Sequence, residues 1–152
     1  MGSPAGNGAI VAAVLSASLA LLANQVIAHL WDRPRLFAAH PLTTHLFAAP
    51  STDPSFPSDH AAAASAIAVA ILAFSRPMGA AFVAAATLIA LSRVVVGLHY
   101  PSDILAGAAV GTGAALFVTH LGGPVIDLAV RVGSALTDPP LIRLRRLPPR
   151  AN

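Results

Sequence analysis

The sequence contains no cysteine, no lysine and no glutamate. The lack of cysteine excludes disulfide bonds, thiolate metal sites and cysteine nucleophiles. Every cation is therefore an arginine and every anion an aspartate, a bias that we attribute to a GC-rich genome. Charged residues make up 10% of the chain, whereas an average soluble domain carries about 25%. Because so little charge cannot cover a surface that faces water, we expect lipid to be the solvent.

Apolar residues are abundant instead. They make up 56% of the chain, and the mean hydropathy is +0.74. The apolar residues form four long stretches, Ala9–Leu30, Ala61–Phe74, Met78–Leu91 and Ile104–Leu121. A helical span needs about 20 residues, and the flanks of the two shorter stretches can lengthen them. The sequence therefore predicts an all-α fold, an integral-membrane bundle of about four transmembrane helices.

Three other segments differ from these stretches. The segment Arg35–Asp59 is rich in proline and has no helical period, so we expect a loop. In Val125–Leu136, Asp127 and Arg131 are four residues apart on one helix face, which predicts an interfacial amphipathic helix. We assign residues 1–136 to one membrane domain. Residues 137–152 are basic and rich in proline, and we expect a disordered cytoplasmic tail.

The arginines also predict an orientation. Four of them, at positions 143, 145, 146 and 150, place the tail in the cytoplasm by the positive-inside rule. Counting back through four spans puts the Arg35–Asp59 loop and the Val94–Ser102 connection on the outer face. Because the basic residues lie at segment ends and the net charge is only +3, a pI near 11.1 indicates membrane topology and not a nucleic-acid partner.

Three polar clusters fall on that outer face, each at the end of an apolar helix. Arginine supplies planar pairs of donors that suit phosphate oxygens. Ser58 can cap the helix that begins near His60, which leaves backbone N–H groups directed at an anion. Pro101 fits the first turn of the fourth span, so Asp103 lies just inside that helix. Together the clusters predict a phosphate site. They are Arg33-Pro34-Arg35, Pro57-Ser58-Asp59-His60, and Ser92-Arg93 with His99 and Asp103.

These clusters match motifs of a known family. Ser92-Arg93, five residues, His99, three residues and Asp103 fit Ser-Arg-x5-His-x3-Asp in full. The segment Pro57–His60 fits Pro-Ser-Gly-His at three of four positions. The first motif along the chain, Lys-x6-Arg-Pro, is the weakest match. In it Arg35 fits the arginine, while leucine follows in place of proline and Ala28 stands where lysine is expected.

From about Asn24 to Leu136 the sequence therefore resembles the type 2 phosphatidic acid phosphatase (PAP2) superfamily, and within it the bacitracin-resistance undecaprenyl-pyrophosphate phosphatases. Members of this superfamily usually have six helices. The resemblance thus implies that the first two are missing here, as in a fragment or a reduced member.

The resemblance also implies a role for each site residue. His99 would attack phosphorus and form a phosphohistidine, and Asp103 would accept the other ring N–H. His60 would act as the general acid and then as the base. Arg33 would compensate for the missing lysine, and no metal ion or cofactor would be needed. The residues that would bind the phosphoryl group are Arg35, Arg93, Ser58 and Asp59.

The sequence thus predicts a multi-pass phosphohydrolase of the bacterial plasma membrane, with its active site on the outer face. Its substrate would be a lipid phosphate or pyrophosphate, with undecaprenyl pyrophosphate as the specific expectation. The alternatives are a phosphatidic acid or phosphatidylglycerophosphate phosphatase and a truncated, non-catalytic membrane protein. The sequence does not indicate an oligomeric state. His40 and His45, five apart in a loop, have no further ligand at a metal-binding spacing and are expected to be exposed.

Overall fold

The computed structural model describes residues 4–42, 44 and 53–137 of the chain, and within these residues every regular element is a helix. The helices are α1 (Pro4–Leu30), α2 (Leu36–Ala39), α3 (Asp59–Phe74), α4 (Arg76–Val95), α5 (Pro101–Leu121) and α6 (Gly123–Thr137). The all-α bundle expected from the sequence is confirmed. Each of the four apolar stretches lies within one of the long helices.

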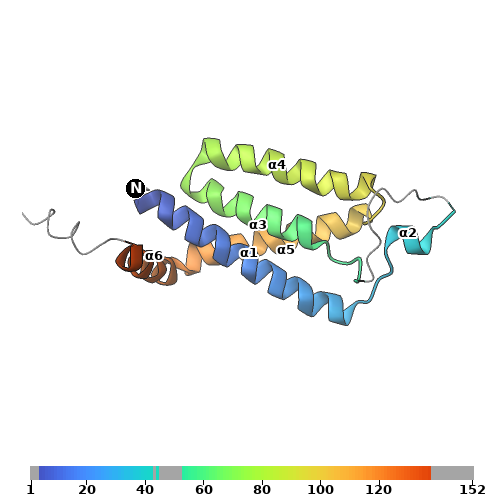
Figure 1. The fold of residues 1–152 in the computed structure, drawn as a ribbon, viewed down its shortest axis with the longest axis horizontal. Helices are drawn as coiled ribbons and strands as arrows, with labels where there is room; N and C mark the ends of the chain where they lie inside the picture. Colours follow the sequence, from blue (N-terminus) through green and yellow to red (C-terminus); the bar gives the residue numbers. More distant parts are fainter. Residues whose placement is uncertain (1–3, 43, 45–52, 138–152) are drawn as a thin grey trace, which may run out of the picture.

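The four long helices form a bundle with α3 at its centre (Figure 1). Helix α3 packs against α1, α4 and α5, whereas α1 and α4 make no contact with each other in the described part of the chain. Short turns join α3 to α4 and α4 to α5, so successive helices run in opposite directions (Figure 1). The end of α1, the start of α3, the end of α4 and the start of α5 therefore meet at one end of the bundle.

Small residues allow the close packing around α3. A Cβ atom added to Gly107 of α5 would overlap the carbonyl oxygen of Ser58, and one added to Gly111 would overlap the carbonyl oxygen of Ala62. The core residues of α3 are mostly alanines, and several of them are fully buried. This agrees with membrane helices in general, where small side chains let the backbones approach.

Three of the helices are long and apolar enough to cross a bilayer, namely residues 6–30 of α1 and the whole of α4 and α5. Helix α3 is apolar but has 16 residues, which corresponds to about 24 Å against a hydrocarbon thickness of about 30 Å. The other three helices surround α3, so much of its backbone lies within protein rather than in lipid although the helix is short.

The segment between α1 and α3 corrects one expectation. We expected a loop throughout Arg35–Asp59, but residues Leu36–Ala39 form the short helix α2. Leucine, phenylalanine and two alanines make up this turn, and all are compatible with a helix that begins after the extended residue Arg35. The peptide bond between Phe56 and Pro57 is cis.

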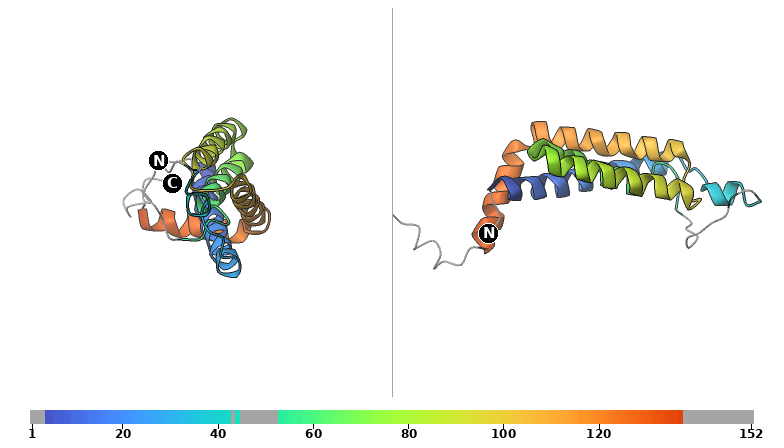
Figure 2. Two further views of the ribbon diagram at one scale, coloured as in Figure 1. Left: turned by 90° about the vertical axis from the view of Figure 1, so that its right-hand side faces the viewer. Right: turned by 90° about the horizontal axis from the view of Figure 1, so that it is seen from above.

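Helix α6 leaves the bundle axis and crosses the end opposite to the four meeting helix ends (Figure 2). Ile126 is buried against the core formed by α1, α3 and α5, while Val125, Leu128 and Val132 are exposed. A helix is thus present where an amphipathic one was expected, and its place at the membrane interface stays a prediction. The expected disordered tail began at Thr137, which is instead the last residue of α6. The rest of that tail, residues 138–152, lies outside the described residues.

Candidate active site

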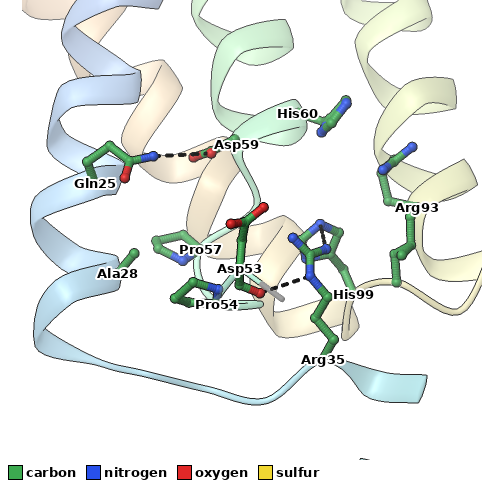
Figure 3. A pocket seen from close by; sticks show the side chains of 11 residues that line it. Gln25, Ala28, Arg35, Asp53, Pro54, Pro57, Asp59, His60, Arg93 and His99 are labelled. Carbon is green, nitrogen blue, oxygen red and sulfur yellow. Dashed lines mark hydrogen bonds between the residues drawn. The ribbon is translucent and has the colours of Figure 1, made fainter. Parts of the chain in front are cut away.

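A polar cavity of about 590 Å³ lies at the end of the bundle where the four helix ends meet (Figure 3). It brings together two histidines and two arginines from distant parts of the sequence, His60 of α3, His99 of the α4–α5 turn, Arg35 before α2 and Arg93 of α4. The rest of its lining consists of Gln25, Ala28, Asp53, Pro54, Pro57, Asp59 and Leu98. The expectation that these clusters share one face of the bundle agrees with this geometry.

A tight turn between α4 and α5 sets the position of His99. Gly97 has a φ of 79°, in the left-handed region that favours glycine. The backbone N–H groups of Leu98 and His99 then donate to the carbonyl oxygen of Arg93, at 3.2 and 3.4 Å. The chain thereby turns back on the end of α4, and the imidazole of His99 is only 5% exposed.

The two ring nitrogens of His99 have different surroundings. Nδ1 lies 2.8 Å from the carbonyl oxygen of Ser55, so it must carry the proton that this oxygen accepts. In the neutral ring Nε2 then carries a lone pair, which accepts from the Arg35 guanidinium. The guanidinium of Arg35 lies 3.4 Å from Nε2 (Figure 3). An anion that binds next to this nitrogen would therefore also contact Arg35.

Electrostatics keep this imidazole neutral. Burial lowers the pKa of His99 from its ordinary value, and the positive charges of Arg35 and Arg93 lower it further, against opposing effects of the Ser55 carbonyl and Asp103. Burial also lowers the pKa of Arg35, with Asp53 acting in the opposite direction. A guanidinium nevertheless stays charged at neutral pH. The cavity therefore pairs an unprotonated nitrogen with permanent positive charge.

The contact expected between His99 and Asp103 is different from the one found. Asp103 lies at the start of α5 as expected, but its Oδ2 is 3.8 Å from Nδ1 of His99, beyond hydrogen-bond distance. Oδ2 instead accepts from the hydroxyl of Ser55 at 2.6 Å and from the backbone N–H of Tyr100 at 2.9 Å. These two closer donors occupy the carboxylate oxygen that would otherwise approach the ring.

Arg33 also lies elsewhere than expected. We expected it to replace the missing lysine, but it is not among the residues that line the described cavity. Its guanidinium donates to Asp103 Oδ1 at 2.9 Å and to the Ser102 hydroxyl at 2.8 Å, and it stacks on Tyr100 with 3.9 Å to the ring centroid. The buried carboxylate attracts this cation, so Arg33 stabilises the base of the site and leaves the cavity to Arg35 and Arg93.

The Pro57–His60 motif lies at the start of α3. Ser58 caps this helix, with its hydroxyl accepting from the backbone N–H of Ala61 at 3.5 Å, as the sequence predicts. Ser58 is fully buried and is absent from the described lining of the cavity. Asp59 lines the cavity, but its carboxylate accepts from Asn24 Nδ2 at 2.9 Å and Gln25 Nε2 at 3.5 Å.

Ala28 lines the cavity at the position where the first motif has a lysine. A longer side chain at this position of α1 would extend from the same wall as Gln25. The contacts that Ser55, Asn24 and Gln25 make with the site residues were not predicted from the sequence. Ser55 belongs to an irregular segment where no spacing rule applies, and the two amides lie within an apolar helix. An amide in such a helix is itself a signal, because it needs a polar partner.

The sequence of the chain is similar to those of known proteins. A family model described as the PAP2 superfamily matches residues 9–126. The chain belongs to the PAP2 superfamily. Its PAP2 relatives include the undecaprenyl-diphosphatase BcrC of Bacillus subtilis, with 37% identity over 78% of this chain and 62% of that protein. The putative undecaprenyl-diphosphatase YbjG of Escherichia coli is 30% identical over 67% of this chain and 51% of that protein.

A third PAP2 relative is the bacitracin transport permease protein BcrC of Bacillus licheniformis, with 32% identity over 72% of this chain and 53% of that protein. The chain thus spans between half and two thirds of the length of these relatives. No solved structure gave a significant match. All three relatives are bacterial, in agreement with the expected source of the chain.

Proposed function

We propose that this PAP2 protein is a membrane phosphatase that removes the terminal phosphate of a lipid phosphate or pyrophosphate through a phosphohistidine at His99. The observation that carries the proposal is the state of the His99 ring. Its Nδ1 is bound to the Ser55 carbonyl, while Nε2 lies beside the Arg35 guanidinium in the polar cavity. A neutral nitrogen nucleophile next to a fixed cation is what attack on a phosphoryl group requires.

In the proposed reaction Nε2 of His99 attacks phosphorus, and the P–O bond to the leaving group breaks as the N–P bond forms. Protonated His60 donates its proton to the leaving oxygen. Neutral His60 then takes a proton from a water molecule whose oxygen attacks phosphorus, which breaks the N–P bond and releases inorganic phosphate. Arg35 and Arg93 bind the phosphoryl oxygens throughout. No metal ion or cofactor takes part in these steps.

Ser58 and Asp59 have a smaller part than the motif implies. Because the Ser58 hydroxyl is buried in the helix cap and the Asp59 carboxylate can only accept hydrogen bonds, neither side chain offers a donor to phosphate. We assign them to shaping the start of α3, whose backbone N–H groups are oriented toward the cavity end. Asp103 and Arg33 lie outside the described cavity lining and stabilise the segments that carry the site residues.

An apolar groove of about 770 Å³ supports a lipid as the substrate. Its α1 wall runs from Gly6 to Leu21 at helical spacings, and Gln25 and Ala28 of the polar cavity continue the same stripe. The rise of a helix places Leu21 about 6 Å from Gln25 along the axis. We infer that the phosphate head group binds in the cavity and that the apolar tail lies along this groove between α1 and α4.

Undecaprenyl pyrophosphate is the specific substrate that we propose, because two relatives bear the name undecaprenyl-diphosphatase. The orientation that the arginines predict would place the cavity on the outer face of the plasma membrane. One observation favours a different class of function. Ala28 lines the cavity in place of the expected lysine, so the site has one cation fewer for a pyrophosphate. A protein that binds lipid phosphates without hydrolysing them is therefore the second candidate.

Phosphate release in detergent separates these candidates. The substrates are undecaprenyl pyrophosphate, phosphatidic acid and phosphatidylglycerophosphate, each with and without EDTA, and the control is the His99→Ala protein. We expect release from undecaprenyl pyrophosphate to be fastest, to persist in EDTA and to depend on His99. Faster release from a glycerophospholipid would assign the alternative substrate. Binding of the lipids with no release by the parent protein would identify the non-catalytic candidate.

A further inference from the structure

Among the described residues, hydrogen bonds connect the buried carboxylate of Asp103 to His99 only through Ser55. Its Oδ2 accepts from the Ser55 hydroxyl at 2.6 Å, while Nδ1 of His99 is 3.8 Å away. The same serine presents its carbonyl oxygen to Nδ1 at 2.8 Å. Both Ser55 and Asp103 have an exposed fraction of 0%. Ser55 is therefore interposed between the carboxylate and the imidazole. Its carbonyl oxygen is bound to the ring, and its hydroxyl is bound to the carboxylate and also lies 3.4 Å from Nδ1.

Ser55 is held from a second direction by Arg33. The backbone N–H of Ser55 donates to the carbonyl oxygen of Arg33 at 2.8 Å. The guanidinium of Arg33 in turn donates to Oδ1 of Asp103 at 2.9 Å. Arg33, Ser55 and Asp103 thus form a closed set of contacts that joins the end of α1, the segment before α3 and the start of α5. None of the three belongs to the described lining of the cavity.

We propose that Ser55 is the positioning residue of His99 and that Asp103 acts on the imidazole through it. The proposal rests on the proposed function, in which His99 is the nucleophile. The Ser55 carbonyl fixes the tautomer with a proton on Nδ1, and the Ser55 hydroxyl keeps the carboxylate away from the ring. Arg33 offsets the negative charge of Asp103. The neutral imidazole therefore makes no direct hydrogen bond to the carboxylate, 3.8 Å away, and Nε2 keeps its lone pair.

The charges that act on His99 come from three elements. Arg35, before α2, and Arg93, at the end of α4, face it across the cavity, and Asp103 of α5 lies behind it. Removing the Ser55 hydroxyl takes one of the two donors from Asp103 Oδ2, which keeps the Tyr100 N–H, and opens the space through which Oδ2 can approach Nδ1. An opposite charge that moves closer favours the protonated imidazole. The proposal thus predicts that loss of this hydroxyl raises the pKa of His99.

The test is an NMR titration of the full chain in detergent with isotope-labelled histidine, where the His99→Ala spectrum identifies the His99 signal. We expect Ser55→Ala to raise the pKa of His99 by about 1, and Ser55→Thr, which keeps the hydroxyl, to restore the parent value. Ser16→Ala is the matched control. It also removes a fully buried serine hydroxyl, but Ser16 lies in α1 and its Oγ has no hydrogen-bond partner among the described residues.

An unchanged pKa of His99 in Ser55→Ala would overturn the proposal, because a direct pair of His99 and Asp103 does not involve the serine. If Ser55→Ala does not fold, Arg33→Gln provides the second variant. It leaves the charge of Asp103 without its cation, and we expect the pKa of His99 to rise; an unchanged value would again overturn the proposal. The titration needs no turnover. A parent protein without phosphatase activity would therefore refute the proposed function and leave the positioning role to be decided by the pKa.

Discussion

At the scale of single residues, the proposed chemistry depends on a nucleophile that is neutral while cations surround it. The Ser55 carbonyl binds Nδ1 of His99, and Arg35 lies 3.4 Å from Nε2. Burial and the two arginines lower the pKa of His99, so the reactive form is present at and somewhat below neutral pH. The same cations would bind the phosphoryl oxygens, which means that a single pair of side chains serves both the nucleophile and the substrate.

This dual effect predicts the pH dependence of the reaction. Neutral His99 is the reactive form, so kcat/KM should fall as the pH decreases through the pKa of His99, which lies below its ordinary value of about 6.5. Arg35→Gln removes a positive charge that lowers this pKa. We expect the acid limb of the kcat/KM profile to move to higher pH, together with weaker activity. An acid limb that stays in place or moves to lower pH would contradict the electrostatic role of Arg35.

The residue scale also shows what sequence can predict. His60, Arg35, Arg93 and His99 line one cavity as the motifs implied. His60 and Arg93 lie at ends of helices that follow from the apolar pattern, and His99 lies in the short turn between two such helices, whereas Arg35 precedes α2. The partners of Asp103 were not predictable in the same way. They depend on the path of the irregular segment before α3, and no periodicity specifies which atom of such a segment will face a buried carboxylate.

At the scale of helices, the apolar runs predicted the existence of each long element better than its ends. Helix α4 begins at Arg76 and not at Met78, because Pro77 is tolerated in the first turn of a helix. It also continues to Val95, four residues past the end of the apolar stretch at Leu91. Helix α2 was missed because a single turn of four residues is too short to show a period.

The packing of α3 against α5 depends on a missing side chain at Gly111. A methyl group there would overlap the backbone of Ala62, so Gly111→Ala should lower the free energy of unfolding by about 1–3 kcal/mol. Gly113→Ala is the matched control on the same helix, since its added Cβ has nothing within 4 Å in the described structure. Thermal unfolding in detergent measures both. Equal stability of the two variants would show that α5 does not pack on α3 as described.

The groove between α1 and α4 gives a second test at this scale. Leu21 lines the groove, whereas its neighbour Leu22 is 66% exposed and lies outside that lining. We expect Leu21→Trp to reduce kcat/KM for a long-tailed lipid phosphate by about tenfold, the equivalent of about 1.4 kcal/mol of tail contact. Hydrolysis of a water-soluble aryl phosphate should change little, and Leu22→Trp should affect neither. A loss of the same size with both substrates would place the tail elsewhere.

At the scale of the whole molecule, the charge distribution and the bundle together predict one orientation. The cavity and α2 lie at the end where α1 and α4 finish, and Leu42, three residues after α2, is 97% exposed. The absence of cysteine permits labelling at single introduced sites. A cysteine at Leu42 should react with a membrane-impermeant reagent on intact cells, and a cysteine at Ala151 should not. The reverse pattern would place the cavity in the cytoplasm.

The central claim is that His99 carries the phosphoryl group during turnover. Rapid-quench trapping with a labelled, activated aryl phosphate tests it most directly, because a good leaving group needs little help from His60. We expect His60→Ala to accumulate an acid-labile, base-stable label, since a general base contributes about 10²–10⁴-fold to the hydrolysis that follows. His99→Ala should trap no label and should not turn over. If His99→Ala keeps activity close to that of the parent protein, or traps as much label as His60→Ala, then His99 is not the nucleophile.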